Sequence, residues 1–184
     1  MGVLPPPRDT DRPLGHLVRE LASHLGVPAT VAVCVDLLAG GDPAPYAVEV
    51  VYLSGLRVGP AEREAYWFRA WGARGLLHVW TEDAGPAVLR GLHDEHWRPA
   101  ESCLKVASKR ELGEAGPAAV EMLGHDRPRM RAQAARFLGI AGDTEHVGAV
   151  RAALDDPDPA VRRAAGRALT RLDRRLDLPG IEAW

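Results

Sequence analysis

A segment of the chain recurs three times, and each copy begins 31 residues after the previous one. The copies begin at Trp97, Pro128 and Pro159 and read WRPAESCLKVA, PRMRAQAARFL and PAVRRAAGRAL. A fourth segment, FRAWGARGLL from Phe68, keeps the same frame. A fixed period of this length is typical of helical-repeat proteins, in which each unit buries its apolar face against its neighbours.

Each copy has the pattern of a helix, a turn and a second helix. In the last copy Asp158 is a predicted N-cap, and Pro159 stands at the first helical position, where a missing N–H costs nothing. Gly142 is expected to end the helix one copy earlier, and a second helix is expected from Thr144 to Leu154. One apolar stripe at helical spacing runs along each first helix. Its members are Val161, Ala165, Ala168, Leu169 and Leu172 in the last copy, and Met130, Ala134, Phe137, Leu138 and Ala141 in the copy before.

These residues resemble the HEAT repeat family, in the short form often called PBS-lyase-like HEAT repeats. The motif is visible as DPDPAVRRAAGRAL from Asp156 and as HDRPRMRAQAARFL from His125. The resemblance extends over residues 66–176 and implies a structural, stacking role for Arg131 and Arg162. It also implies a protein-binding scaffold, although some members of the family act on bilin chromophores and a distant group excises alkylated DNA bases.

The predicted fold is all-α: a right-handed α-solenoid of short helical hairpins with about 9–10 helices. Residues 1–12 are predicted to be a flexible lead-in, residues 13–60 divergent N-terminal helices that cap the array, and residues 61–184 the repeats. The repeat units lie near 66–95, 97–126, 128–157 and 159–176.

The N-terminal third is less regular, and its helices are predicted from apolar spacing and from Gly and Pro stops. The segment YAVEVVYL, residues 46–53, has the β-branched content of a strand, but a lone strand would lack a pairing partner, so a helix is favoured. The predicted helices are Asp11–Leu25, Ala29–Leu38, Tyr46–Leu53 and a long helix Ala61–Trp80.

Trp67, Trp71, Arg74 and His78 share one face of the predicted long helix, apart from its core stripe. Tryptophan and arginine dominate protein-binding hot spots, so this face is a candidate anchor for a partner. The alternative, which we favour, is that it packs under the N-terminal helices. The second helices carry further candidate contacts of mixed charge. These are Arg90, Glu121 and Arg151.

Two other polar patterns have simple structural interpretations. A row of basic residues could contact phosphates, but a solvated outer face is favoured because the net charge is −2. The segment His93–His96 has no metal-site spacing, so no metal is predicted there, and Asp94 is expected to cap the next helix. The basic row consists of Arg74, Lys105, Arg136 and Arg167.

The predicted function is a protein–protein interaction module without catalytic activity or cofactor, because no nucleophile, P-loop or dinucleotide motif is present. Cys103 stands in the small-residue core column, where a thiol is inert. The partner is expected to be another protein rather than nucleic acid, and a homodimer is left open. The chain shows neither a secretory signal nor an apolar stretch that could span a bilayer, so a cytoplasmic location is expected. The alternatives are a DNA-binding or base-excising protein and a bilin-lyase-like protein that handles a small molecule.

Overall fold

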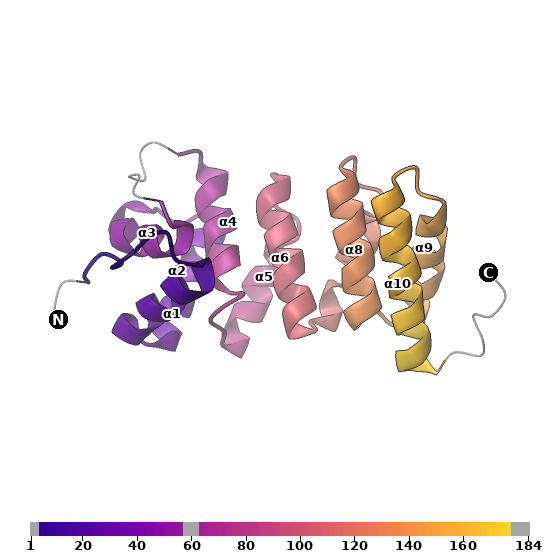
Figure 1. The fold of residues 1–184 in the computed structure, drawn as a ribbon, viewed down its shortest axis with the longest axis horizontal. Helices are drawn as coiled ribbons and strands as arrows, with labels where there is room; N and C mark the ends of the chain where they lie inside the picture. Colours follow the sequence, from indigo (N-terminus) through magenta and orange to yellow (C-terminus); the bar gives the residue numbers. More distant parts are fainter. Residues whose placement is uncertain (1–3, 57–62, 178–184) are drawn as a thin grey trace. The chain divides into compact units, whose positions relative to one another are not determined.

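The computed structural model describes residues 4–56 and 63–177 of the chain (Figure 1). These residues form ten α-helices, joined by turns and short 3₁₀ segments, and contain no β-strand. The prediction of an all-α helical-repeat fold is therefore confirmed. The chain divides into two compact units, residues 1–106 and residues 107–184, and the boundary falls within one helix, α6 (Trp97–Arg110).

Unit 1 begins with three helices that precede the clear repeats. Its helices, besides the first part of α6, are α1 (Leu14–Leu25), α2 (Val27–Leu38), α3 (Ala47–Ser54), α4 (Ala65–Gly75) and α5 (Gly85–Gly91). Gly26 joins α1 to α2 with a φ of 84°, a backbone conformation that glycine adopts without strain, and the two helices meet at a bend of 118°. No single described helix is long and apolar enough to cross a bilayer; only the bent pair α1 and α2 passes that test, by length and composition.

The ambiguous segment Tyr46–Leu53 is helical, as favoured. A 3₁₀ turn over Ala44–Tyr46 leads directly into α3, and Gly55 ends the helix in the left-handed conformation. The side chain of Tyr52 is fully buried, and its hydroxyl donates to the carbonyl oxygen of Pro5 at 3.1 Å. Part of the predicted lead-in is therefore held against the helices by a hydrogen bond to α3.

The predicted long helix Ala61–Trp80 is wrong in its extent. Of its first residues, 61 and 62 lie outside the described residues, and α4 spans only Ala65–Gly75. Beyond Gly75 the backbone tightens, because the N–H of His78 donates to the carbonyl of Gly75 three residues earlier, at 2.8 Å. Trp80 lies beyond this turn, and its indole N–H donates to Glu82 at 3.0 Å.

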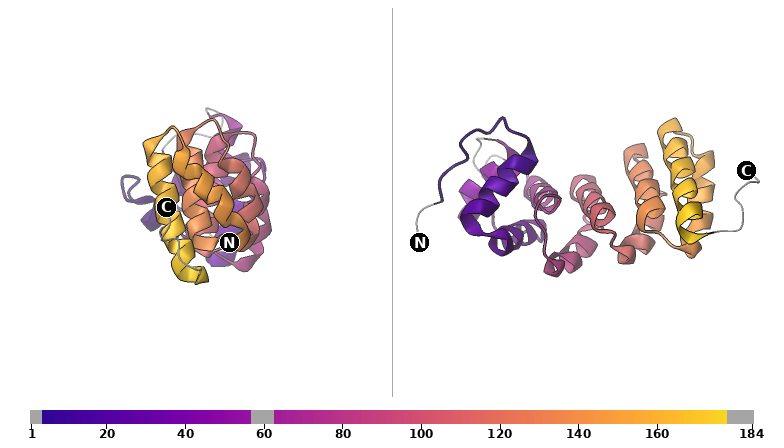
Figure 2. Two further views of the ribbon diagram at one scale, coloured as in Figure 1. Left: turned by 90° about the vertical axis from the view of Figure 1, so that its right-hand side faces the viewer. Right: turned by 60° about the horizontal axis from the view of Figure 1, so that its bottom comes forward.

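Unit 2 consists of two hairpins that follow the predicted pattern. Its helices, besides the end of α6, are α7 (Gly116–Met122), α8 (Pro128–Ala141), α9 (Val147–Ala152) and α10 (Pro159–Leu176). Helices α8 and α10 run side by side, as Figures 1 and 2 show. The two apolar stripes form the core between them: every member is buried except Ala141, which is half-buried.

The predicted helix ends of unit 2 are also confirmed. The Asp158 carboxylate accepts from the N–H of Ala160 at 2.7 Å, and Pro159 begins α10. Gly142 ends α8, and its N–H donates to Leu138. The second helix predicted from Thr144 to Leu154 is present, with a 3₁₀ turn at each end of α9.

In unit 2, an ion pair between an arginine of α8 and an aspartate fixes the turn between α9 and α10. The Arg131 guanidinium donates to both carboxylate oxygens of Asp156, at 2.7 and 2.9 Å, and also to the carbonyls of His125 and Asp126. Arg162 donates to the carbonyl of Asp156 at 2.7 Å. The structural role expected for Arg131 and Arg162 is thus seen directly in these bonds.

The same pairing recurs in unit 1 between Arg69 and Asp94, at 2.6 and 3.0 Å. Arg69 and Asp94 stand 62 residues, two periods, before Arg131 and Asp156. The copy between them has Ala100 and His125 at the corresponding positions, so its sequence lacks the pair.

We predict that Phe137→Ala lowers the free energy of unfolding by about 3–5 kcal/mol, because the fully buried ring leaves a cavity. Denaturant titration followed by circular dichroism measures this loss. The matched control is Arg136→Ala, whose side chain is exposed on the same helix and whose loss should stay within about 0.5 kcal/mol. A loss below about 1 kcal/mol for Phe137→Ala would contradict the assignment of the stripe to the core.

We predict that Arg131→Met destabilises the fold at neutral pH by about 1–3 kcal/mol, because it strips the Asp156 carboxylate of its charged partner. Hydrogen bonding to Arg131 holds the pKa of Asp156 below its ordinary value. A carboxylate with a lowered pKa stabilises the fold above its unfolded pKa of about 3.9, and this contribution is lost as the pH falls below that value.

The difference in unfolding free energy between wild type and Arg131→Met should therefore stay constant from pH 7 to about 4 and shrink as the pH falls further. Arg163→Met, at an exposed position of α10, is the control and should change little at either pH. A difference that also stays constant below a pH of about 4 would show that the ion pair does not carry the effect.

Candidate functional site

Five half-buried side chains gather where two first helices of unit 1 begin, and we call them the aromatic cluster. They come from the first turn of α4, the first turn of α6 and the residue before α6. The members are Tyr66, Trp67, His96, Trp97 and Arg98.

The repeat explains why these residues lie together. Tyr66 and Trp97 stand one period apart, at the position where the next two copies have Pro128 and Pro159. The first two copies thus replace the proline that starts the helix with an aromatic residue. Stacked repeats bring equivalent positions side by side, so neighbouring first turns place their aromatic residues together.

An arginine holds the cluster together. The Arg98 guanidinium carbon lies 4.7 Å from the centroid of the Trp67 ring and 4.6 Å from that of Trp97. Both distances are within the range of cation–π attraction, which is stronger where water is excluded. Tyr66 and His96 stack beside it, with ring centroids 3.7 Å apart and an interplanar angle of 15°. The rings and the guanidinium are thus already ordered in relation to each other.

Local hydrogen bonds position the segment before α6. The N–H of Arg98 donates to Nδ1 of His96 at 3.3 Å, so His96 caps the helix. Asp94 was expected in that role, and this prediction is wrong, because its carboxylate accepts from the N–H of His96 at 2.8 Å and is shared with Arg69. Burial, followed by a hydrogen bond to Glu64, raises the pKa of the Tyr66 hydroxyl, which stays neutral at physiological pH.

The face predicted from Trp67, Trp71, Arg74 and His78 is not one exposed surface. Trp71 is only 3% exposed, stacks on Trp67 at 5.9 Å and meets the edge of Phe68 at 5.3 Å. His78 is half-buried against α1, where a Cβ on Gly15 would lie 2.8 Å from Nδ1 of the imidazole. The packing interpretation therefore describes Trp71 and His78, while Trp67 belongs to the aromatic cluster. Arg74 is half-buried, and burial lowers its pKa.

The candidate contacts on the second helices lie in both units. Arg90 is exposed on α5 in unit 1. Glu121 is exposed on α7, and Arg151 is half-buried on α9, both in unit 2. Their contribution to binding stays a prediction.

Most of the predicted basic row is engaged within the protein. Lys105 pairs with Glu101 at 3.0 Å, and Arg136 donates to Gln133 at 3.3 Å. Arg74 is half-buried. Among the described residues, Arg167 is therefore the one member of the row whose side chain is exposed and makes no hydrogen bond or ion pair. This arrangement offers little for phosphate binding.

Three residues of the His93–His96 segment likewise make contacts within the protein. Asp94 and Glu95 both accept from Arg69, and His96 stacks on Tyr66. Across residues 4–56 and 63–177, no group of three or more His, Cys, Asp and Glu side chains could hold a metal ion. Both cysteines are buried; burial raises the pKa of Cys34 to about 12 and that of Cys103 further, so neither thiol ionises at neutral pH.

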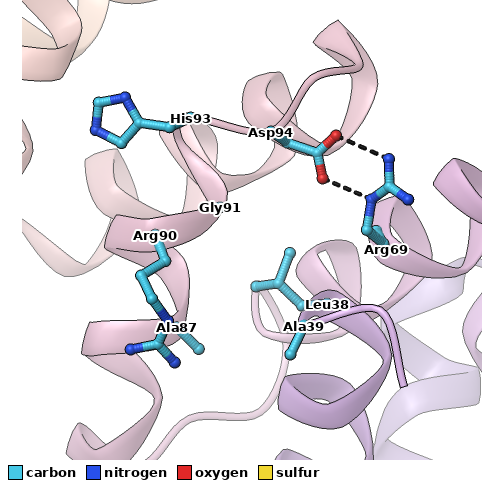
Figure 3. A pocket seen from close by; sticks show the side chains of 8 residues that line it. All are labelled: Leu38, Ala39, Arg69, Ala87, Arg90, Gly91, His93 and Asp94. Atoms are coloured by element: carbon cyan, nitrogen blue, oxygen red, sulfur yellow. Dashed lines mark hydrogen bonds and ion pairs between the residues drawn. The ribbon is translucent and has the colours of Figure 1, made fainter.

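A shallow pocket opens between the end of α2 and the end of α5 in unit 1 (Figure 3). Its volume is about 270 Å³. Gly91 lets α5 approach both α2 and α6 closely, because a Cβ there would lie 3.0 Å from Leu38 of α2 and 2.5 Å from the Cys103 sulfur of α6. The lining residues are Leu38, Ala39, Arg69, Ala87, Arg90, Gly91, His93 and Asp94.

Comparison with known families decides the repeat class. The family model of HEAT repeats matches residues 116–183, which include α7 to α10. Residues 116–183 are therefore HEAT repeats. No curated protein matches the chain.

The sequence analysis had missed four members of the aromatic cluster. Tyr66, His96, Trp97 and Arg98 were not predicted as site residues, because reading along one helix does not show which residues of the next helix lie beside it. A signal was nevertheless present: the proline column of the repeat changes to aromatic residues in the first two copies.

We predict that Trp71→Ala and Trp67→Ala have different effects on stability. Trp71→Ala should cost about 3–5 kcal/mol of unfolding free energy, because its ring is buried. Trp67→Ala should cost clearly less, because its ring is half-buried and lines the surface cluster. Thermal and denaturant unfolding of the two variants provide the comparison, and equal losses would mean that Trp67 is also a core residue.

Proposed function

We propose that this HEAT-repeat protein is a protein-binding module and that the aromatic cluster of unit 1 is its main contact surface. HEAT repeats generally mediate protein–protein interactions and are typically not catalytic. The observation that carries the proposal is the position of the Arg98 guanidinium over both Trp67 and Trp97 in a half-buried cluster.

The composition of the cluster suits protein recognition. Tryptophan, tyrosine and arginine are the residue types most enriched among binding hot spots. A large aromatic ring offers much contact area, and rings already stacked lose little further freedom when a partner binds. Trp67 and Trp97 thus combine apolar area with a low ordering cost, and Arg98 adds a planar set of donors over both rings.

The cluster also goes beyond what the fold needs. In unit 2, the helices α8 and α10 start with proline, and they pack along their apolar stripes without an aromatic residue at that position. Two tryptophan rings that are only half-buried leave apolar area in contact with water, which a partner could cover.

We predict that Arg98→Ala and Trp97→Ala each weaken partner binding by at least about tenfold, because each removes a central element of the cluster. The matched control is Arg129→Ala, which changes the exposed residue at the same repeat position as Arg98, one copy later. Affinity purification from native cell extract, with all variants checked by circular dichroism, identifies the partner. Titration with that partner then measures its affinity.

The outcomes separate the alternatives. A protein that is retained by wild type and Arg129→Ala and lost with Arg98→Ala supports the proposal. A protein retained equally by all variants would place the interface elsewhere. Recovery of nucleic acid that is released by salt would favour a DNA-binding function instead.

A further inference from the structure

The pocket between α2 and α5 combines an apolar wall with a cationic rim. Leu38 and Ala87 are buried and form part of the wall, together with Ala39. Arg90 and His93 are exposed at the α5 side of the pocket (Figure 3). A ligand that enters would therefore meet hydrocarbon on one side and nitrogen donors on the other.

The charge of Arg90 is not compensated by the surrounding protein. Among the residues that the structure describes, no hydrogen bond or ion pair involves the side chain of Arg90 or of His93. The other cation of the pocket, Arg69, is fully occupied, because it donates to Asp94 at 2.6 and 3.0 Å and to Glu95 at 3.1 Å. The acidic residue of the pocket is thus neutralised, and the unbalanced charge is positive.

Two helix ends lie at the pocket, and their partial charge is negative, opposite in sign to the charge of Arg90. Ala39 and Gly91 stand at the C-terminal ends of α2 and α5, where a helix carries a partial negative charge of about half a unit at most. This partial charge fades within one turn, so the full charge of Arg90 prevails. The same carbonyl groups can accept hydrogen bonds from the backbone of a bound peptide.

The size of the pocket limits what it can hold. About 270 Å³ is below the range of roughly 300–1,000 Å³ that is usual for small-molecule sites, so one side chain fits better than a metabolite or a chromophore. The position one repeat later is Glu121 in place of Arg90, and Gly124 stands in place of His93. The cationic rim is therefore a property of this copy and not of the repeat.

We propose that the pocket binds an acidic side chain, glutamate or aspartate, of a partner protein. The carboxylate pairs with Arg90, and its short stem lies against Leu38 and Ala87. This inference rests on the proposed function only in that a protein supplies the side chain; the aromatic cluster takes no part in it.

The test is a titration of the ¹⁵N-labelled full chain followed by NMR. The probe is a blocked alanine peptide with one central glutamate, and the matched probe has glutamine at that position. We expect saturable shifts of the amide signals of Ala39 and Gly91 with the glutamate peptide, and binding at least about tenfold weaker with the glutamine peptide, because a charge-assisted bond is lost.

Two variants locate the interaction. Arg90→Glu introduces the residue that the chain itself has at Glu121, and it should abolish the shifts. Arg19→Ala removes an exposed arginine of α1 in the same unit and should leave them unchanged. Free glutarate forms a third arm, and it should shift the same signals more weakly than the peptide does, because it lacks the backbone groups that meet the helix ends.

The proposal is overturned if the two peptides bind equally, if Arg90→Glu binds like wild type, or if no signal near the pocket shifts. Glutarate that binds more tightly than the peptide would also overturn it, in favour of a small-acid site. The proposed function fails separately, through partner retention by Arg98→Ala, so the two outcomes can be told apart.

Discussion

The close approach of neighbouring helices is the constraint on which the rest of this structure depends. A Cβ on Gly72 would lie 2.4 Å from the carbonyl oxygen of Cys34, and one on Gly139 would lie 2.6 Å from the Cα of Ala168. Such contacts are possible only where a residue has no side chain, so these positions of the first helices carry glycine and the core packs at the density of a protein interior. Tyr66 and Trp97 could not occupy these positions, and they stand instead in the first turns of α4 and α6.

The arginine–aspartate pair connects this packing to the candidate site. Arg69 holds both carboxylate oxygens of Asp94, and this fixes the turn between α5 and α6. The same short segment carries His93 at the pocket and His96 at the aromatic cluster. One buried ion pair, with side chains 16% and 7% exposed, therefore positions two surface features at once. Because the Asp94 carboxylate already accepts three hydrogen bonds, two from Arg69 and one from His96, we regard the segment as a support for the site.

Periodicity made the fold predictable, and its limits explain what was missed. The stripe around Phe137 and the cap at Asp158 depend on neighbours within one hairpin, so spacing along the sequence was sufficient to predict them. The end of α4 was wrong because the apolar pattern continues beyond Gly75, although the backbone tightens there. His78 shares a helical face with Trp67, but Gly15, from 63 positions earlier in the chain, covers it, and no local pattern reports such a contact. The contact of Arg98 with Trp67 was not predicted for the same reason, because Trp67 belongs to another repeat.

The distribution of the repeat consensus bears on where function resides. Residues 116–183 match the HEAT family and keep proline at the helix starts and the pair of Arg131 with Asp156. The aromatic cluster lies within residues 66–98 and the pocket within residues 38–94, and both ranges fall outside that match. A repeat that departs from its consensus loses some of the contacts that favour regular stacking, and such a departure at exposed positions needs another source of advantage. Three residues that differ from the repeat consensus have exposed or half-buried side chains: Tyr66, Trp97 and Arg90. At such positions the stability of the fold constrains the choice of residue least. The regular repeats therefore account for how the chain folds, and the divergent ones are the better place to look for what it recognises.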